Sequence, residues 1–348
     1  MYLKNLACLV VETMKYLFEL SKEHGYIPKA EVFSCLKAEN ISYKMLDSNN
    51  DILLLDLKIK PEQLSKISSR LAMSFFIDTF LFSSPLCFDR IYNLANKNVI
   101  KKDGSIAIKY TNRSKSADSQ EILKILAEAY TRNRKVDLEN PDIEVRFLIS
   151  DEKVYVGCKQ VEIDRSQFER RKVQYRPFFS PISLHPRLAR ALVNLSCVSR
   201  DGVLLDPFCG TGGILLEAGL IGVKVVGSDI EDKMIDGCEK TLSFYKVKDF
   251  ELFTCDIGDI NRYVSVVDAV VTDFPYGKST TTKGESVFDL SSRAFDSISS
   301  ILKKKSRAVV GLPNSDLVSV GENYLTLVDI FEFRVHRSLT RFFAIFEK

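Results

Sequence analysis

One stretch of the chain, residues 203–214, constrains the fold more than any other. It starts with an apolar run that ends in Asp206, turns through three glycines and enters a helical pattern at Ile214. A strand, a glycine turn and a helix in this order let a backbone approach a ligand closely at the carboxyl end of a parallel sheet. The stretch therefore predicts an α/β fold whose binding site lies where the strands end.

Acids at the strand ends indicate the kind of ligand. The next strand pattern, 223–229, ends in Asp229, which is well placed to bind the two hydroxyls of a ribose. Asp206 stands before the glycines, so the turn is not the G-x-G-x-x-G pattern of dinucleotide-binding proteins. A carboxylate there repels a pyrophosphate and suits a cationic ligand without phosphate. We therefore expect S-adenosylmethionine as the cofactor, which disfavours a nicotinamide oxidoreductase.

Two later strand patterns, 251–256 and 266–273, also end in acids, Asp256 and Asp273. Strands that end in aspartate and alternate with helices predict a parallel sheet. Helices are expected at 232–244 and 294–302, and further strands at 308–312, 324–335 and 340–346.

The sequence before residue 160 reads as a separate α/β region, because 348 residues exceed one average domain. Its apolar periodicity predicts helices at 12–23, 29–39, 61–69, 88–96 and 119–131, and strands at 51–59, 71–82, 105–110, 143–149 and 153–157.

Composition excludes several classes of protein. No apolar run reaches the ~18 residues that indicate a membrane span. The eight cysteines form no C-x-x-C pair and there are only three histidines, so we expect no metal site. Reduced cysteines without an export signal predict a cytoplasmic protein.

The most specific chemical signal is the tetrapeptide at 273–276, Asp-Phe-Pro-Tyr. An exocyclic amine of a base is a poor nucleophile, because its lone pair is delocalised into the ring. Asp273 and a backbone carbonyl at Phe274 or Pro275 can accept its two N–H hydrogens, align it with a methyl donor and take a proton. Tyr276 can stack on a base that has left its helix. The tetrapeptide predicts methylation of a base amine; a strand-to-loop turn with a core tyrosine is the alternative.

The proline-rich segment 176–187 precedes the glycine turn directly. Its prolines predict a rigid extended loop that ends at the start of a helix. We expect it to form a wall of the cofactor pocket, and a plain domain connector is the other interpretation.

Residues 136–157 resemble the end of the THUMP domain, an RNA-binding module of tRNA-modifying enzymes. The matching residues are Val136, Asp137, Leu138, Pro141 and Asp142, followed by the Val-Tyr-Val-Gly strand at 154–157.

Residues from about 175 onward look like a class I S-adenosylmethionine-dependent methyltransferase, and the whole chain resembles the archaeal tRNA guanine-10 N2-methyltransferases. The segments that carry the resemblance are Arg176-Pro-Phe, Pro186-Arg-Leu-Ala-Arg-Ala, the 205–215 glycine motif, Gly227-Ser-Asp-Ile, Thr272-Asp-Phe-Pro-Tyr-Gly and His336-Arg-Ser-Leu-Thr-Arg. The resemblance implies a Rossmann-like domain with a seven-stranded, mostly parallel sheet, preceded by an α+β region with a THUMP domain. It also leaves open a small activator protein as a partner.

The resemblance implies roles for individual residues. Asp206 and the 209–213 turn would hold the methionine end of the cofactor, and Asp229 the ribose. The adenine would lie against Ile230 and Ile257, with its amino group on Asp256. The expected cofactor-binding residues are Asp206, Phe208, Cys209, Gly210, Thr211, Gly213, Asp229, Ile230, Asp256, Ile257 and Asp273, and the expected catalytic residues are Asp273, Phe274, Pro275 and Tyr276.

Phe274 departs from the family pattern, since many relatives have a second proline there. The backbone carbonyl survives this change, so we expect activity to survive as well. The turn is expected to be less rigid, with an aromatic ring available to contact the base or the cofactor.

The THUMP resemblance implies that the N-terminal half binds the acceptor end of tRNA. The net charge of +3 is modest, but cations gather in 97–115, where only Asp103 opposes them. A solvated surface is the alternative reading of such a cluster. The candidate RNA-binding residues are Lys101, Lys102, Lys109, Arg113, Arg132, Arg134 and Lys135.

These observations predict three parts: an N-terminal region at 1–160 with the THUMP domain at about 50–158, a linker at 161–178 and a methyltransferase domain at 179–348. The expected activity is N2-methylation of a tRNA guanine, guanine 10 by resemblance, with one or two methyl groups added. Another tRNA or ribosomal RNA guanine is an alternative substrate. A catalytically silent RNA-binding subunit is a further alternative, which the intact set of four aspartates disfavours.

Overall fold

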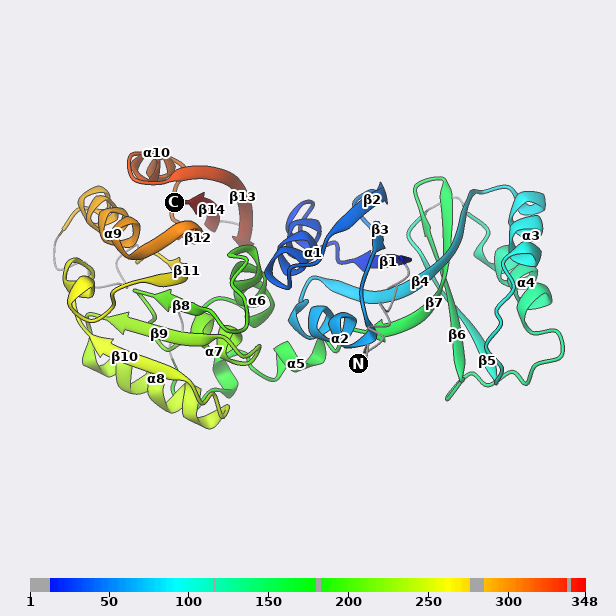
Figure 1. Ribbon diagram of the computed structural model, residues 1–348, viewed down its shortest axis with the longest axis horizontal. Helices are drawn as coiled ribbons and strands as arrows, with labels where there is room; N and C mark the ends of the chain where they lie inside the picture. The colour runs from blue at the N-terminus through cyan, green and yellow to red at the C-terminus, as the bar shows by residue number, and fades with distance from the viewer. Residues whose placement is uncertain (1–12, 115–116, 180–182, 276–284, 337–338) are drawn as a thin grey trace, which may run out of the picture. The chain divides into compact units, whose positions relative to one another are not determined.

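A computed structural model describes residues 13–114, 117–179, 183–275, 285–336 and 339–348 (Figure 1). Its internal contacts divide the chain into two compact units. The first unit contains Met1–Lys22, Ile41–Ser68 and Ser74–Ile163. The second unit contains Glu23–Asn40, Ser69–Met73 and Asp164–Lys348.

The first unit is built on a seven-stranded sheet with the order β2-β3-β1-β4-β7-β6-β5. The pair β5 and β6 is parallel, and the other neighbouring pairs are antiparallel. Asp118 starts helix α4, because its side chain accepts hydrogen bonds from the backbone N–H groups of Gln120 and Glu121. The elements are β1 (Met14–Leu20), β2 (Tyr43–Ser48), β3 (Ile52–Leu57), α2 (Pro61–Arg70), β4 (Ser74–Pro85), α3 (Phe88–Lys97), β5 (Ile106–Asn112), α4 (Ser119–Tyr130), β6 (Ile143–Ser150) and β7 (Lys153–Glu162).

The second unit contains another seven-stranded sheet, with the order β10-β9-β8-β11-β12-β14-β13. The first five strands in this order are parallel to one another. Strand β14 pairs with β12 in the antiparallel direction, and β13 pairs with β14 in the antiparallel direction. The strands are β8 (Val203–Asp206), β9 (Lys224–Asp229), β10 (Phe250–Thr254), β11 (Val267–Asp273), β12 (Leu302–Leu312), β13 (Thr326–His336) and β14 (Leu339–Glu347). The predicted mostly parallel seven-stranded sheet is confirmed.

Helices cover both faces of this sheet (Figure 1). One hydrophobic cluster joins the strands to α1, α6, α7 and α8, and a second joins them to α9, α10 and η2. The helices are α1 (Ile27–Ala38), α5 (Ser166–Glu169), η1 (Val173–Tyr175), α6 (Pro186–Leu195), α7 (Gly213–Gly219), α8 (Asp232–Phe244), η2 (Ile257–Arg262), α9 (Val287–Ile301) and α10 (Asp316–Glu322).

The chain order places a site at the middle of the second sheet. From β8 the chain moves outward to β9 and β10, then returns to β11 on the other side of β8. Such a reversal opens a crevice at the carboxyl ends of the two central strands. Those ends carry Asp206 and Asp273.

The division into units differs from the three parts expected from the sequence. Helix α1 and residues 69–73 lie in the second unit, because buried Glu31 of α1 accepts hydrogen bonds from the backbone N–H groups of Ala72 and Met73 and from Nδ2 of Asn194. Burial raises the pKa of Glu31 to about 7. The expected linker belongs mainly to the same unit, which begins its last segment at Asp164.

The predicted helix at 12–23 is wrong. Residues 14–20 form β1, a central strand between β3 and β4. Strand β2 and helix α10 were not predicted. No helix in the described part of the chain is long and apolar enough to cross a membrane, and no cluster of three potential metal ligands occurs in that part.

Candidate active site

The glycine turn follows β8 and leads into α7. Gly210 and Gly212 have φ angles of +50° and +79°, which favour glycine. A side chain at Gly212 would also meet Sγ of Cys238 at 2.6 Å, whereas a Cβ at Gly210 would meet no described atom within 4 Å. The turn is therefore packed on one side and has free space at Gly210.

Asp206 is buried at the end of β8. Its Oδ1 accepts hydrogen bonds from Oγ1 of Thr272, at 2.6 Å, and from the backbone N–H of Phe208, at 3.2 Å. Burial, with a smaller contribution from the charges of Asp229 and Asp273, raises the pKa of Asp206 to about 7. The two neighbouring acids thus disfavour ionisation of Asp206, and a bound cation would offset this effect.

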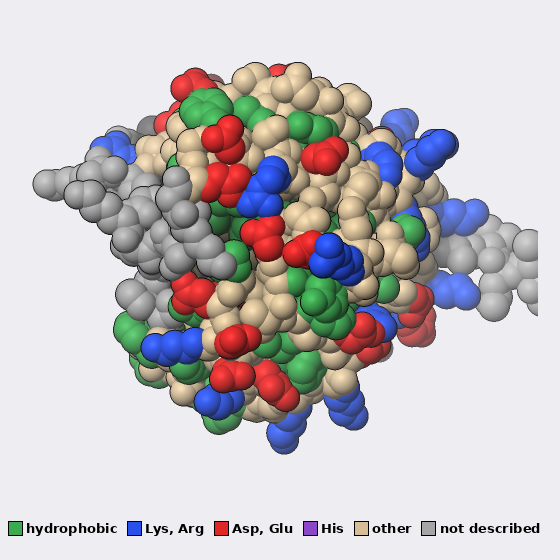
Figure 2. All heavy atoms as spheres, turned by 90° about the vertical axis from the view of Figure 1, so that its left-hand side faces the viewer, with side chains coloured by type: hydrophobic (Ala, Val, Ile, Leu, Met, Phe, Trp, Pro, Cys, Tyr) green, Lys and Arg blue, Asp and Glu red, His purple; other side chains and the backbone are tan. Residues whose placement is uncertain are grey.

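Asp229 is bound to the same turn. Its carboxylate accepts hydrogen bonds from the backbone N–H groups of Gly210 and Glu231, both at 3.0 Å. Burial raises the pKa of Asp229 above its ordinary value. Ile230, which follows it, is half-buried. Figure 2 shows acidic side chains interspersed with Lys and Arg over this face of the second unit.

Asp256 lies at the start of η2, next to β9, where the neighbouring Cys255 donates a backbone hydrogen bond to Asp229. The Asp256 carboxylate accepts from the backbone N–H of Gly258 and forms an ion pair with Arg293 at 2.6 Å. Arg293 also binds Glu285. Asp256 is therefore already engaged by a cation that the sequence did not indicate.

Asp273 ends β11, and its carboxylate reaches across the sheet. Oδ2 forms an ion pair of 2.7 Å with Arg341 of β14, although β12 lies between the two strands. The carboxylate can pass because Gly311 of β12 is the residue in register with Asp273; a Cβ there would lie 2.4 Å from Oδ1. Oδ1 is enclosed and has no hydrogen-bond donor among the described residues.

Phe274 does not reach the ligand side of the site. Its ring is buried and packs between Phe208 and Phe295, each at a centroid distance of 5.3 Å. The expectation that this ring contacts the base or the cofactor is therefore wrong, because the ring fills the core beneath the turn. The backbone N–H of Phe274 donates to the carbonyl of Gly311, which fixes the start of the turn.

The remaining predicted site residues are mostly buried near the turn. Pro275 is half-buried, and Tyr276 lies outside the described residues. The turn residues Cys209 and Thr211 are buried, as is Ile257 of η2.

The segment at 176–187 lies against the glycine turn. An added Cβ at Gly213 would be 3.1 Å from both the Arg176 guanidinium and Oγ of Ser183, and a Cβ at Gly237 would strike the ring of Phe178. Arg176 is buried and donates from Nε to the carbonyl of Arg171. The segment therefore supports the turn from one side; residues 180–182 lie outside the described part.

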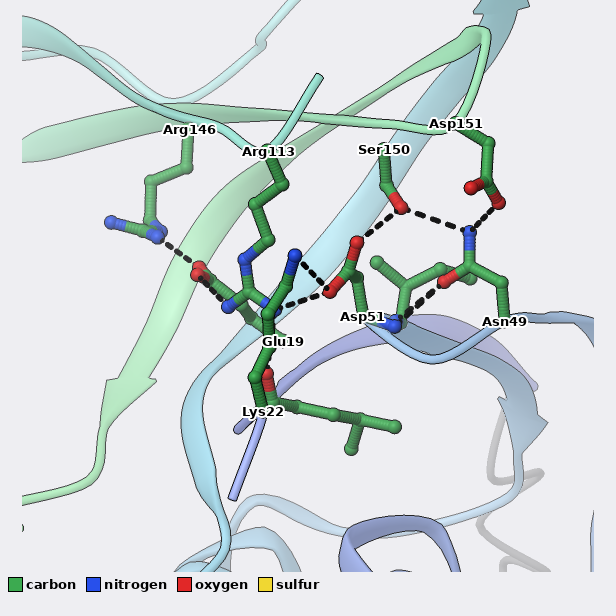
Figure 3. Close-up of polar contacts among 10 residues, drawn as sticks. Glu19, Lys22, Asn49, Asp51, Arg113, Arg146, Ser150 and Asp151 are labelled. Carbon is green, nitrogen blue, oxygen red and sulfur yellow. Dashed lines mark hydrogen bonds and ion pairs between the residues drawn. The ribbon is translucent and has the colours of Figure 1, made fainter. Parts of the chain in front are cut away.

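Arg113 was expected to bind RNA, and the structure contradicts this. Its guanidinium is buried in the first unit, where it binds Glu19 and Asp51 at 2.8 Å each (Figure 3). Arg146 binds the other oxygen of Glu19 at 2.6 Å. A guanidinium enclosed by carboxylates holds sheet strands together and is not available to a phosphate.

The other RNA-binding candidates differ in exposure and in the contacts that they already make within the protein. Lys102 and Arg134 donate to backbone carbonyls, and Lys109 pairs with Glu144 at 2.9 Å. Lys101, Lys102, Lys109, Arg132 and Lys135 are exposed, and Arg132 lies 4.0 Å from Glu128 in an exposed ion pair.

Comparison with known proteins gives the family. A methyltransferase domain model described as RMKL-like matches residues 173–342, and the THUMP domain model matches residues 88–159. The chain is 33% identical over 340 residues to the tRNA (guanine(10)-N2)-dimethyltransferase of Methanothermobacter thermautotrophicus, covering 96% of this chain and 100% of the relative. The chain belongs to this family. The predicted resemblance is confirmed.

Solved structures agree on the fold. The chain resembles TrmN from Thermus thermophilus with a TM-score of 0.58 and 18% identity, covering 96% of this chain and 99% of TrmN. It resembles SMU.472, crystallised with SAH, with a TM-score of 0.53 and 14% identity, covering 97% and 98% of the two chains. The fold is therefore that of a THUMP-containing class I methyltransferase.

Proposed function

We propose that this chain methylates N2 of guanine 10 in tRNA, with S-adenosylmethionine as methyl donor. Membership of the tRNA (guanine(10)-N2)-dimethyltransferase family supports the substrate. The name of that relative also supports two successive transfers, which give N2-methylguanosine and then N2,N2-dimethylguanosine.

The observation that carries the proposal is the carboxylate of Asp273. Its Oδ1 is enclosed and lacks a hydrogen-bond donor among the described residues. Leaving such an acceptor unpaired costs about 1–3 kcal/mol or more, so the site favours a ligand that brings an N–H group. An exocyclic amine is such a donor, and its second N–H can bind the backbone carbonyl of Phe274 or Pro275.

The residues around the turn fit the cofactor. Asp206, Asp229 and Asp273 form an anionic group in which burial and mutual repulsion raise the pKa of Asp206 to about 7. A positively charged amino group or sulfonium would lower this pKa again. Free space beside Gly210 allows a ligand to approach the backbone. We assign the methionine end to Asp206 and the turn, and the ribose to Asp229.

Bound S-adenosylmethionine supplies an electrophilic methyl group on a sulfonium. Asp273 holds the amine in line with this group and takes the proton that the nitrogen loses when the N–C bond forms. Burial raises the pKa of Asp273 to about 6, even though the charge of Arg341 opposes this rise. The carboxylate is thus ionised at neutral pH and basic enough to accept a proton.

The THUMP domain supports tRNA as the partner that delivers the guanine. Phosphate contacts by such a domain position a substrate without reading its sequence. We assign these contacts to Lys101, Arg132 and Lys135, because the exposed Lys102 and Lys109 already bind the carbonyl of Asp142 and the carboxylate of Glu144.

The test is incubation of the full chain with bulk tRNA and methyl-labelled S-adenosylmethionine, followed by digestion and nucleoside analysis. We expect label in N2-methylguanosine and N2,N2-dimethylguanosine, and its loss in Asp273→Ala. Asp268→Ala is the matched control, because Asp268 lies on the same strand but binds Lys303 and the backbone N–H of Val203.

The outcomes separate the alternatives. Label in another nucleoside would contradict the substrate and keep the enzyme class. Tight tRNA binding with no methylated product from any RNA would favour the catalytically silent subunit.

A further inference from the structure

The sequence signal at residues 273–276 gave no role to Arg341, which lies almost 70 residues later in the chain. Arg341 is 6% exposed and donates from Nη1 to Oδ2 of Asp273 at 2.7 Å. The contact crosses a whole strand, because β12 separates β11 from β14. Nothing in the local sequence of the Asp-Phe-Pro-Tyr turn requires a cation at this distance.

The sheet is built to permit this contact. Asp273 pairs with Gly311 of β12, and Gly311 pairs with Phe343 of β14. Arg341 stands two residues from Phe343, so both side chains point to the same face of the sheet. Gly311 is the residue between the two charged partners, and any side chain there would overlap Oδ1 of Asp273.

The contact gives the two oxygens of the Asp273 carboxylate different surroundings. Oδ2 is held by the guanidinium, and Oδ1 keeps its lone pairs without a donor among the described residues. We propose that Arg341 is a positioning residue for methyl transfer: it holds Oδ2 of the Asp273 carboxylate, so that Oδ1 is the oxygen left to accept from the substrate amine. The proposal rests on the proposed function of the same site.

The charges around Asp273 explain why a cation is needed. Burial raises the pKa of Asp273, whose charge in turn raises the pKa of Asp206 on β8. Arg341 is the group whose charge opposes the effect of burial on Asp273. Without it, the carboxyl would be protonated near neutral pH and could not take the proton that the amine loses.

Two measurements on the full chain test this role. The first is the pKa of Asp273, from the carboxyl ¹³C shift in protein labelled at aspartate, with Asp273→Asn to assign the signal. Loss of an opposite charge at contact distance raises a pKa by about 1–3 units, so Arg341→Met should move the Asp273 titration upward by that amount. This readout does not depend on any substrate.

The second measurement is the single-turnover rate of guanine methylation between pH 5.5 and 9, a range that lies on both sides of the Asp273 pKa of about 6. In Arg341→Met, we expect the acid limb of the profile to move upward with the Asp273 pKa. The rate at pH 6 should then fall at least about fivefold more than the rate at pH 9. Arg341→Lys should restore part of the profile, because it keeps the charge but loses the planar fork.

Arg307→Met is the matched control, since Arg307 is a half-buried arginine of β12 that binds the carbonyl of Leu195 and pairs with Glu347. Its profile should keep the wild-type shape. An unchanged Asp273 titration in Arg341→Met, or a rate lowered equally at all pH values, would overturn the positioning role. Absence of methylguanosine with wild-type protein would instead refute the proposed function, and the NMR titration would still decide whether Arg341 controls Asp273.

Discussion

At the scale of single residues, the site depends on carboxylates that the fold holds in unfavourable electrostatic surroundings. Asp206 is buried beside two other acids, and Asp273 keeps one oxygen without a donor among the described residues. These features lower the stability of the free protein and favour a cationic cofactor and an N–H-bearing substrate. Binding sites often contain such costs, because the ligand later removes them.

Gly311→Ala tests whether the space beside Gly311 is needed to hold the Asp273 carboxylate in place. The new methyl group would lie 2.4 Å from Oδ1, so Asp273 must move and lose its alignment. We expect the single-turnover methylation rate to fall at least about tenfold, in line with the sensitivity of catalysis to small displacements. Gly25→Ala is the control, because no described atom lies within 4 Å of the added methyl group. Equal rates for both variants would contradict this account.

Asp206→Asn tests the strain at the cofactor site. The folded-state pKa of Asp206, about 7, exceeds its ordinary 3.8, so the folded state binds a proton more tightly. The ionised group therefore destabilises the fold, with a cost that grows from about pH 4 and is complete above about pH 7.

The asparagine variant should consequently have a higher Tm than wild type at pH 8. Its free energy of unfolding should exceed that of wild type by about 1–4 kcal/mol at this pH, and the difference should shrink at pH 5. The same variant should bind S-adenosylmethionine more weakly by calorimetry. Asp249→Asn, at an exposed position, is the control for both measurements. A lower Tm at pH 8 would show that the Asp206 carboxylate stabilises the free protein.

At the scale of elements, α7 carries the glycine turn and is held by two arginines. Glu217 of α7 binds Arg171 at 2.8 and 3.0 Å and Arg190 at 2.8 Å, and all three side chains are buried. Arg190 also donates to the backbone carbonyl of Glu217. The helix that begins at the turn is therefore anchored from α6 and from the segment before the proline-rich loop.

Glu217→Ala should destabilise the protein by about 3–5 kcal/mol, because it leaves two guanidinium groups buried without a carboxylate. Urea unfolding measures this loss. The control is Glu251→Ala, which removes an exposed pair with Lys224 and should cost about 0–1 kcal/mol. Similar losses for the two variants would show that the buried pair contributes no more than a surface pair.

Most elements near the site could be predicted, because glycine turns and strand-terminal acids are local signals. Strand β1 could not, since Glu19 interrupts its buried pattern and resembles the polar face of a helix. Its charge is tolerated only because Arg113 and Arg146 reach it from distant segments (Figure 3). The Asp273–Arg341 pair escaped prediction for the same reason: it depends on strand order and register, which no single segment encodes.

At the scale of the whole molecule, the chain combines a family-typical THUMP domain with a methyltransferase unit that also includes α1 and residues 69–73. The domain boundaries expected from the sequence did not assign α1 to the methyltransferase unit. Helix α1 comes before most strands of the first unit in the chain, but it packs in the hydrophobic core of the second unit. The basic cluster was also only partly informative. Sequence composition does not reveal which cations carboxylates already bind, as Arg113 shows.

The salt dependence of tRNA binding tests the remaining cations. The affinity should fall steeply with ionic strength, because each phosphate contact releases counterions. Replacing Lys101, Arg132 and Lys135 by alanine should reduce the slope of log K against log salt by about 0.7–0.9 per lost contact. The same change at the exposed residues Lys240, Lys246 and Lys248 of the second unit should leave the slope unaltered. A flat salt dependence for wild type would contradict phosphate contacts altogether.

The most direct test of the central claim is the position and identity of the product on one defined tRNA transcript. After incubation with S-adenosylmethionine, fragment mass spectrometry should place one and then two methyl groups on guanine 10, and none in Asp273→Ala. A transcript with adenine at position 10 should remain unmodified. Methylation at another position with the same dependence on Asp273, or methylation that persists without Asp273, would contradict the account.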